Sequence, residues 1–131
     1  NYFSRTDSVY QYGMGTYIQV NDTNINKDHR VYVNFWARTN IVDKRFSVAI
    51  ALHDGDNVVF WQEVEASNYV KEPNKWVNII DSVTVPASLV NKPGLILKTF
   101  AFNKNNQAKT IVYDCDDLEI TYKTVIKVLE E

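Results

Sequence analysis

The feature that most constrains this chain is a two-residue alternation of apolar and polar side chains over several short segments. In residues 45–53 (RFSVAIALH), a large apolar side chain stands at every second position from Phe46 to Leu52. That period places the two sets of side chains on opposite faces of an extended strand. No segment before residue 123 keeps a helical period over ten residues. The chain is therefore predicted to be built from β-strands.

Turn signals separate the alternating segments. Asp54-Gly55-Asp56 lies between residues 45–53 and 57–65, and an Asp-Gly pair between two alternating runs favours a β-hairpin. The other separators are rich in Asn, Asp, Lys and Pro, and Asn can adopt the positive φ of a turn in a chain with only four Gly. About seven short strands with regular turns predict an all-β sandwich or barrel. The further strands are expected at about 8–20, 30–38, 76–85, 95–103 and 110–122.

Composition and length narrow the class of protein further. The 131 residues suit one domain, and 45% hydrophobic residues supply a core. Fourteen Lys and Arg against sixteen Asp and Glu give a net charge of −2 without a basic run, so no nucleic-acid partner is expected. No apolar run approaches about 18 residues, so no membrane span is expected. The single Cys excludes an intramolecular disulfide framework and a Cys-based zinc site.

The two ends of the chain carry separate expectations. The sequence starts at Asn1 rather than at Met, which favours processing or excision from a longer protein. The tail could extend the last strand, form a short helix or lead into another domain. We expect one β-sandwich domain over residues 1–122 and a C-terminal extension or linker over residues 123–131.

The sequence lacks the usual catalytic motifs. It contains no G-x-S-x-G, no H-E-x-x-H and no P-loop. Its single thiol, Cys115, is expected to be a packing residue. A glycosidase pair of carboxylates is left open by residue type alone. We predict that the chain is not an enzyme.

An acidic segment near the end of the chain raises the question of a metal. By strand parity, Asp116 shares a face with Leu118 and Ile120, which should point into the core. An inward carboxylate is costly unless it is paired, hydrogen-bonded or bound to a metal. Calcium is the natural ion for oxygen ligands, so a structural Ca²⁺ at Asp116 is one interpretation. The other is a solvated Asp116 at the rim, or one that accepts backbone N–H bonds.

Two tryptophans lie on the unexpected face of their strands. Trp36 and Trp61 both stand opposite the aliphatic set, and the strand 45–53 between them offers only small side chains on its equivalent face. Such a floor with aromatic walls would let a sugar ring stack on an indole while polar groups bond its hydroxyls. The alternative is that loops or the other sheet cover the two indoles, while Trp76 is expected in the core. The candidate polar partners are Asn34, Arg38 and His53.

Four segments together resemble a known family. Val31–Arg38 (VYVNFWAR), Trp76–Pro86 (WVNIIDSVTVP), Leu97–Asn103 (LKTFAFN) and Asp116–Ile120 (DDLEI) are similar, in order and spacing, to strands of bacterial carbohydrate-binding modules of the family 4/9/22 type. The resemblance covers nearly the whole chain. It implies a two-sheet antiparallel β-sandwich, a galactose-binding-domain-like jelly roll. It also implies a noncatalytic module of a secreted or cell-surface bacterial protein, with a polysaccharide or other glycan as partner.

The same resemblance implies a structural calcium between the early loop and the closing strand. That role would fall on Asp116 and Asp7, with backbone oxygens near residues 5–7. The early segment Ser4–Ser8 lacks the glycine that the family has there, and Arg5 offers an alternative partner for Asp116.

Two functions therefore compete at this point. The first is glycan binding by Trp36 and Trp61, with Asn34, Arg38 and His53 as polar partners. The second is a structural or protein-interaction domain of a larger cell-envelope assembly or adhesin, in which other domains or subunits cover these side chains.

Overall fold

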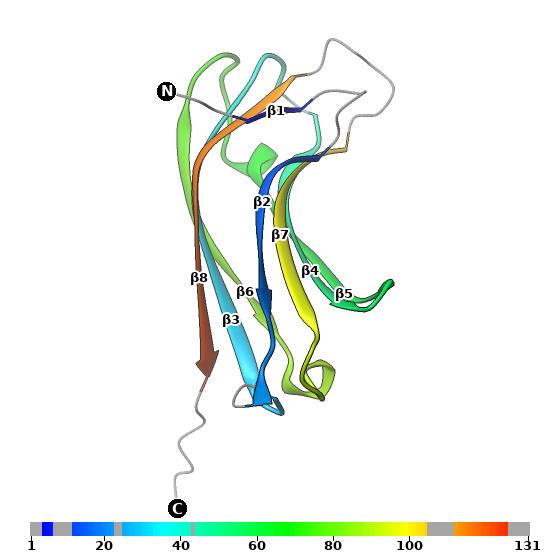
Figure 1. Cartoon of the computed structure of the whole chain (residues 1–131). Coiled ribbons are helices and arrows are strands. Elements are labelled where there is room, and N and C mark those ends of the chain that lie inside the picture. Colours follow the sequence, from blue (N-terminus) through cyan, green and yellow to red (C-terminus); the bar gives the residue numbers. More distant parts are fainter. Residues whose placement is uncertain (1–3, 7–11, 23–24, 43, 105–111, 126–131) are drawn as a thin grey trace, which may run out of the picture.

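Two four-stranded antiparallel sheets pack face to face in the computed structural model (Figure 1). The structure describes residues 4–6, 12–22, 25–42, 44–104 and 112–125. The predicted β-sandwich is confirmed. Among the described residues, no helix is long and apolar enough to cross a membrane.

Sheet A contains the first and the last strand of the chain. Its order is β1-β8-β3-β6, and every neighbouring pair is antiparallel. The strands are β1 (Ser4–Thr6), β8 (Tyr113–Val125), β3 (Asp28–Thr39) and β6 (Val77–Val85). The short β1 is not among the expected strands.

Sheet B has the order β2-β7-β4-β5, again with antiparallel neighbours throughout. Orders of 1-8-3-6 and 2-7-4-5 are those of a jelly roll, in which the chain alternates between two sheets. Its strands are β2 (Tyr12–Gln19), β7 (Ile96–Asn103), β4 (Phe46–Asp54) and β5 (Asn57–Glu65). Short 3-10 helices lie at Ala66–Asn68 after β5 and at Ala87–Leu89 after β6.

The core lies between the sheets and is supplied by the alternating apolar sets. On β3 every second residue from Val31 to Ala37 is at most 1% exposed, and on β4 the same holds from Phe46 to Leu52. Burying a large aliphatic side chain contributes about 1.5–3 kcal/mol, so these alternating positions fix which face of each strand turns inward.

The expected turns are confirmed at three places. β4 and β5 form the predicted hairpin, with Asp54 paired to Asn57 and Gly55 at a φ of 57°. Asn26 and Asn74 take positive φ values of 59° and 61°, so Asn does serve in turns where other sequences use Gly.

In the last strand, β8, the side chains that point into the core differ from those that the sequence predicts. A bulge lies opposite the step from Asn34 to Trp36, and Asp117 there takes a φ of 50°. A bulge inserts one extra residue into a strand, so the residues before it point to the opposite face from the one that a regular alternation predicts. Cys115 is therefore buried in the core, and Asp116 is turned outward, which makes the inward prediction for Asp116 wrong. Burial raises the pKa of the Cys115 thiol to about 12.

The end of the sandwich lies slightly beyond the expected boundary. β8 runs to Val125, so the first three residues of the expected C-terminal extension continue the strand. Residues 126–131 lie outside the described residues.

Candidate functional site

The two half-exposed tryptophans lie on opposite outer faces of the sandwich. Trp36 is on β3 of sheet A, Trp61 is on β5 of sheet B, and each is 42% exposed. Both point away from the core, as the alternation predicts. The prediction of one shared floor is wrong, because β3 belongs to sheet A whereas β4 and β5 belong to sheet B. The molecule therefore has two separate candidate sites.

The first candidate is the outer face of sheet B, which we call the Trp61 face. Cross-strand pairing gives one row of Tyr17, Lys98, Ala51 and Trp61 across all four strands. The adjoining rows bring further outward side chains beside this row. They include Phe100, Phe102, Glu63 and His53.

The indole of Trp61 is held in place from two sides. Its Nε1–H donates to Glu63 Oε2 at 3.1 Å. Its ring meets Phe100 and Phe102 edge to face, with centroid distances of 5.5 and 5.8 Å. Aromatic pairs in this geometry add about 0.5–1.5 kcal/mol each to their burial. The result is a half-exposed ring whose orientation is set before any ligand arrives.

The small residues of β4 have a different role from the one predicted. Ser47, Ala49 and Ala51 are fully buried, although they point away from the core. Their cross-strand neighbours on this face are large: Phe102, Phe100 and Trp61. The small side chains therefore make room for the aromatic rings and are not themselves an open floor.

Glu63 links the aromatic cluster to a charged network. It accepts from Ser47 Oγ at 2.6 Å and lies 3.0 Å from Lys104 Nζ, which also bonds Glu65. Burial by itself would raise the pKa of Glu63, but the hydrogen bonds from Ser47, Trp61 and Lys104, with the charge of Lys104, lower it overall. Glu63 therefore remains a carboxylate and a firm acceptor for the indole.

His53 is the one predicted polar partner that lies on the Trp61 face. It pairs with Ile96 and Val58 at the far end of β4. Partial burial and the charge of Lys98 lower its pKa from 6.5. The imidazole is therefore neutral at pH 7 and can both donate and accept a hydrogen bond.

The second candidate is a depression on the outer face of sheet A, which we call the Trp36 groove. It has a volume of about 410 Å³ and is lined by Trp36, Trp76, Asp116 and Asp117. Trp76 is partly exposed here and is not in the core, so its predicted place is wrong. The guanidinium carbon of Arg38 lies 4.4 Å from the centroid of the Trp76 ring.

The other two predicted polar residues adjoin this groove. Asn34 Oδ1 accepts from Asn78 Nδ2 at 2.8 Å, and Asn78 is the cross-strand neighbour of Trp36. Arg38 lies on the other side of Trp36 along β3. The structure thus groups Trp36, Asn34 and Arg38, and it places Trp61 and His53 apart from them.

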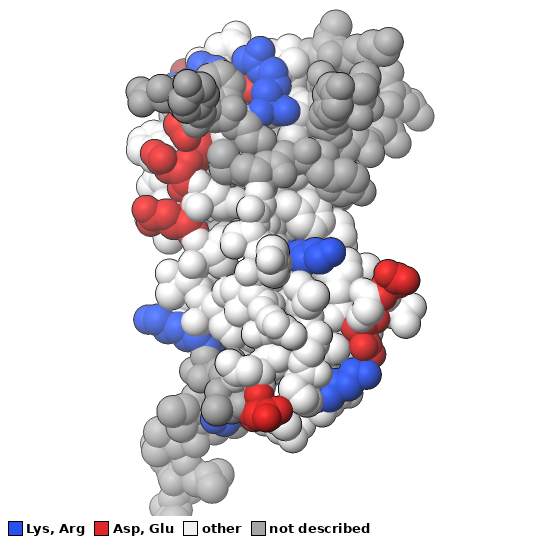
Figure 2. Space-filling model, viewed as in Figure 1, with Lys and Arg blue, Asp and Glu red and all other residues white. Residues whose placement is uncertain are grey.

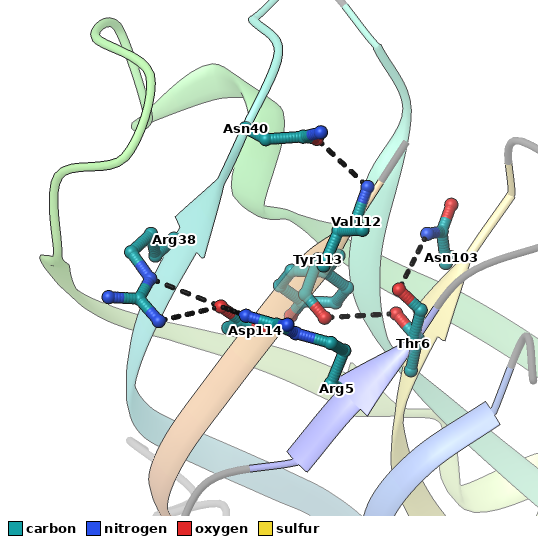
Figure 3. Close-up of polar contacts among 8 residues, drawn as sticks. All are labelled: Arg5, Thr6, Arg38, Asn40, Asn103, Val112, Tyr113 and Asp114. Atoms are coloured by element: carbon teal, nitrogen blue, oxygen red, sulfur yellow. Dashed lines mark hydrogen bonds and ion pairs between the residues drawn. The ribbon is translucent and has the colours of Figure 1, made fainter. Parts of the chain in front are cut away.

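A buried carboxylate, that of Asp114, lies on sheet A where β8 pairs with both β1 and β3 (Figure 3). Asp114 is 2% exposed and bonds two guanidinium groups: Arg5 Nε and Arg38 Nη2 each lie 2.8 Å from one of its oxygens. Arg5, Arg38 and Asp114 also line a hollow of about 270 Å³ with Asn40 and Asn74. From the sequence, the alternative to calcium is an ion pair between Arg5 and Asp116. Arg5 does form an ion pair, but its partner is Asp114.

The calcium prediction stays a prediction. Asp116 lies on the outer face, and its Oδ1 accepts the backbone N–H of Asp117 at 2.8 Å, as the non-metal interpretation expected. The carboxylate that faces β1 is Asp114, which already bonds two guanidinium groups and so does not suit a cation. In the described part of the chain, no group of three or more His, Cys, Asp or Glu could hold a metal. Asp7 lies outside the described residues.

Several residues of these faces escaped the sequence interpretation. Phe100 and Phe102 stand opposite Leu97 and Thr99 in their strand, so their outward facing could have been found from parity. Tyr17, which is 72% exposed, sits on an edge strand whose bounds were too loose to show its facing. The facing of Asp114 could not be read from the alternation, because the bulge in β8 shifts it. The facing of Trp76 could not be read either, because Trp76 lies just before the start of β6.

Comparisons with known proteins bear on the fold. No protein-family model and no curated protein sequence matches this chain. A chain from the T13 viral particle of IBDV is similar over 95% of this chain, with 13% identity and a TM-score of 0.55. A chain from T=1 particles derived from infectious bursal virus also covers 95%, with 12% identity and a TM-score of 0.52.

A third solved structure comes from a study of CBM4 structure and function. The match covers 86% of this chain and 76% of the CBM4 chain, with 12% identity and a TM-score of 0.42. The present chain spans only 29% and 31% of the two viral chains. At these identities the likeness to the viral chains shows the fold alone, a jelly-roll β-sandwich.

Proposed function

We propose that this domain is a noncatalytic glycan-binding module of a secreted or cell-surface bacterial protein, and that it binds a polysaccharide on the Trp61 face. The observation that carries the proposal is the indole of Trp61. It is 42% exposed, yet one hydrogen bond and two ring contacts fix its orientation.

A fixed, half-exposed indole suits a sugar ring for two reasons. The C–H face of a pyranose is apolar and flat enough to stack on an aromatic ring, which removes apolar surface from water. A ring that is already oriented loses little conformational freedom when the ligand arrives, so more of the contact energy remains as affinity.

The neighbours of Trp61 supply groups for the hydroxyls of the ligand. Lys98 lies in the same row, and the neutral imidazole of His53 is on the same strand as Ala51. Together they offer N–H donors and one acceptor beside the stacking surface. Tyr17, at the far end of the row, offers a second aromatic ring.

The test is a titration of the domain with xylan, mixed-linkage β-glucan, galactomannan and dextran, followed by tryptophan emission. We expect at least one polymer to shift the emission, and Trp61→Ala to weaken binding at this face about tenfold or more, or 1.4 kcal/mol. Tyr69→Ala is the matched control, because Tyr69 is 40% exposed and its hydroxyl bonds Asp81 on β6 of the other sheet. Folded wild-type protein that binds none of the four polymers would contradict the proposal.

A further inference from the structure

We infer that the Trp36 groove is a second glycan site, specific for an uncharged chain, so that one domain holds two chains on its two outer faces. Binding in the groove stands on its own geometry, whereas the bridging of two chains rests on the proposed function of the Trp61 face. The groove is built from different residues and a different sheet, and its chemistry differs from that of the Trp61 face.

The two faces cannot serve one sugar ring. The sheets of a sandwich lie about 10 Å apart, and Trp36 and Trp61 point away from each other across that thickness. The core between them is fully packed, with residues such as Phe35 and Ile50 at 0% exposure. A ligand on one face is therefore separated from a ligand on the other by the whole domain.

The groove combines a stacking ring with hydrogen-bond acceptors. In the register of sheet A, Trp36 lies between Asn78 on β6 and Asp116 on β8. Its partly exposed indole lines an open depression of about 410 Å³ together with Trp76, Asp116 and Asp117. A pyranose stacked on Trp36 would thus have carboxylate oxygens beside its equatorial hydroxyls.

The carboxylates favour a glycan over a protein as the occupant. Apolar side chains of a protein partner would suit Trp36, but they would strip water from Asp116 and Asp117 without replacing its hydrogen bonds, which costs free energy. Sugar hydroxyls replace those bonds with short charge-assisted ones. A lining that is half indole and half carboxylate therefore matches a molecule with an apolar ring face and a hydroxylated edge.

The charge around the groove selects an uncharged glycan. Asp116, Asp117 and Glu119 follow one another on β8, and Figure 2 shows acidic side chains gathered along the side where β8 runs. The nearby guanidinium groups of Arg5 and Arg38 are both bonded to Asp114. A uronate or sulfate would therefore meet like charges at close range, which disfavours binding.

The same strand extends the groove into a platform for a chain. Tyr32 is 39% exposed and lies four residues from Trp36 on the same face of β3, about 13 Å away at about 3.3 Å per residue. Asn34 lies between these two rings on β3, and it accepts a hydrogen bond from Asn78, the cross-strand neighbour of Trp36. A glycan that follows β3 would meet the indole of Trp36, the amide of Asn34 and then the phenol of Tyr32, whose ring centroid lies 5.7 Å from Lys123 Nζ. Affinity should therefore grow with chain length.

The first experiment counts sites. A six-sugar fragment of the polymer that binds best in the four-polymer panel is titrated by calorimetry into the wild-type domain and its variants. We expect two fragments per wild-type domain, one for Trp36→Ala, one for Trp61→Ala, and none for the double variant. Tyr69→Ala should keep two. Asp116→Lys is a second groove variant that leaves the rings in place, and it should also keep one.

The second experiment tests bridging and charge selection. Wild-type protein mixed with the full-length polymer should form a turbid network, whereas each single Trp variant should bind without turbidity, because one site cannot cross-link. In the Trp61→Ala background, the groove should bind the neutral polymer at least about tenfold more tightly than polygalacturonate, about 1.4 kcal/mol.

The outcomes separate the two proposals. If Trp61→Ala removes all binding, the second site is overturned and the proposed function stands. If Trp36→Ala removes all binding and Trp61→Ala removes none, the Trp61 face is overturned and so is the bridging. If Trp36→Ala changes only self-association or capture of a protein, the groove is a protein interface and the inference fails. If no polymer binds, both proposals fail.

Discussion

The two outer faces carry charged clusters of opposite design. On sheet A, one carboxylate, Asp114, sits between two guanidinium groups, those of Arg5 and Arg38. On sheet B, one ammonium, that of Lys104, sits between the carboxylates of Glu63 and Glu65. Each cluster places a nearly buried charge between two more exposed opposite charges, which avoids an isolated buried ion.

The difference lies in what each cluster does for its tryptophan. Glu63 bonds the indole of Trp61, so the charged cluster of sheet B fixes the stacking ring. On sheet A, Arg38 stacks on Trp76 and leaves Trp36 to its cross-strand neighbours. One face thus offers a fixed ring beside donors, and the other a ring beside carboxylates. Two sites on one fold therefore need not share a specificity.

The largest expected effect is at Asp114. Asp114→Ala would leave Arg38, whose side chain is only 26% exposed, without its counter-ion. We expect a loss of about 3 kcal/mol in the free energy of unfolding, at the low end for a buried pair because Arg5 is half exposed. Urea unfolding measures this change. Asp116→Ala is the control and should change stability by less than about 0.5 kcal/mol; equal losses would show that the cluster on sheet A has no special role.

The next effect is at Gly15, on the Trp61 face. A Cβ at this position would lie 2.6 Å from Thr99 O and 2.8 Å from Phe100 Cβ, so Gly15→Ala must push β2 from β7 or move Phe100. Overpacking of this kind costs about 1–3 kcal/mol. Thr16→Ala, the next residue, should cost less than about 0.5 kcal/mol in the same urea measurement. A Gly15→Ala variant as stable as wild type would argue against this close approach.

The smallest effect is at Glu63, and it is tested by pH. Because the folded-state pKa of Glu63 lies below its ordinary value of 4.5, the stability it contributes is present above that pH and lost only as the pH falls further. In a Trp36→Phe, Trp76→Phe, His53→Gln background, which removes the titration of the imidazole on this face, the emission of Trp61 should stay constant from pH 7 to about 4.5 and change below it.

The variant Glu63→Gln sharpens the same point. It keeps an acceptor for the indole but loses the charge attraction of Lys104, so we expect a loss of about 1 kcal/mol and an emission change already at pH 7. Emission that responds to neither acid nor Glu63→Gln would mean that this carboxylate does not hold the ring.

The fold followed from the sequence where burial alone decides. The alternation from Phe46 to Leu52 and the turn at Gly55 predicted a strand and a hairpin, because two-faced burial leaves a two-residue period in any such strand. The assignment of strands to the two sheets could not be predicted from the sequence. In a jelly roll the strand after β3 crosses to the other sheet, and local pattern carries no mark of that long-range choice.

The candidate sites followed only in part, for a similar reason. The outward facing of Trp36 and Trp61 was predictable from parity, but their grouping into one site was not, since it depends on the sheet order. The prediction that Asp116 points inward failed because of the bulge at Asp117. The sequence around Asp117 gives no signal strong enough to predict its positive φ. The sequence thus indicated the outward facing of Trp36 and Trp61, and the fold decided which residues surround them.

The most direct measurement is a ¹⁵N spectrum of the three indole N–H groups during titration with the best-binding neutral fragment. The three tryptophans give one signal each, assigned with Trp→Phe variants. We predict that the Trp61 and Trp36 signals both move and that they do so independently, each persisting when the other ring is replaced. Indole signals that all stay in place across the four polymers, in folded protein, would contradict glycan binding by either face.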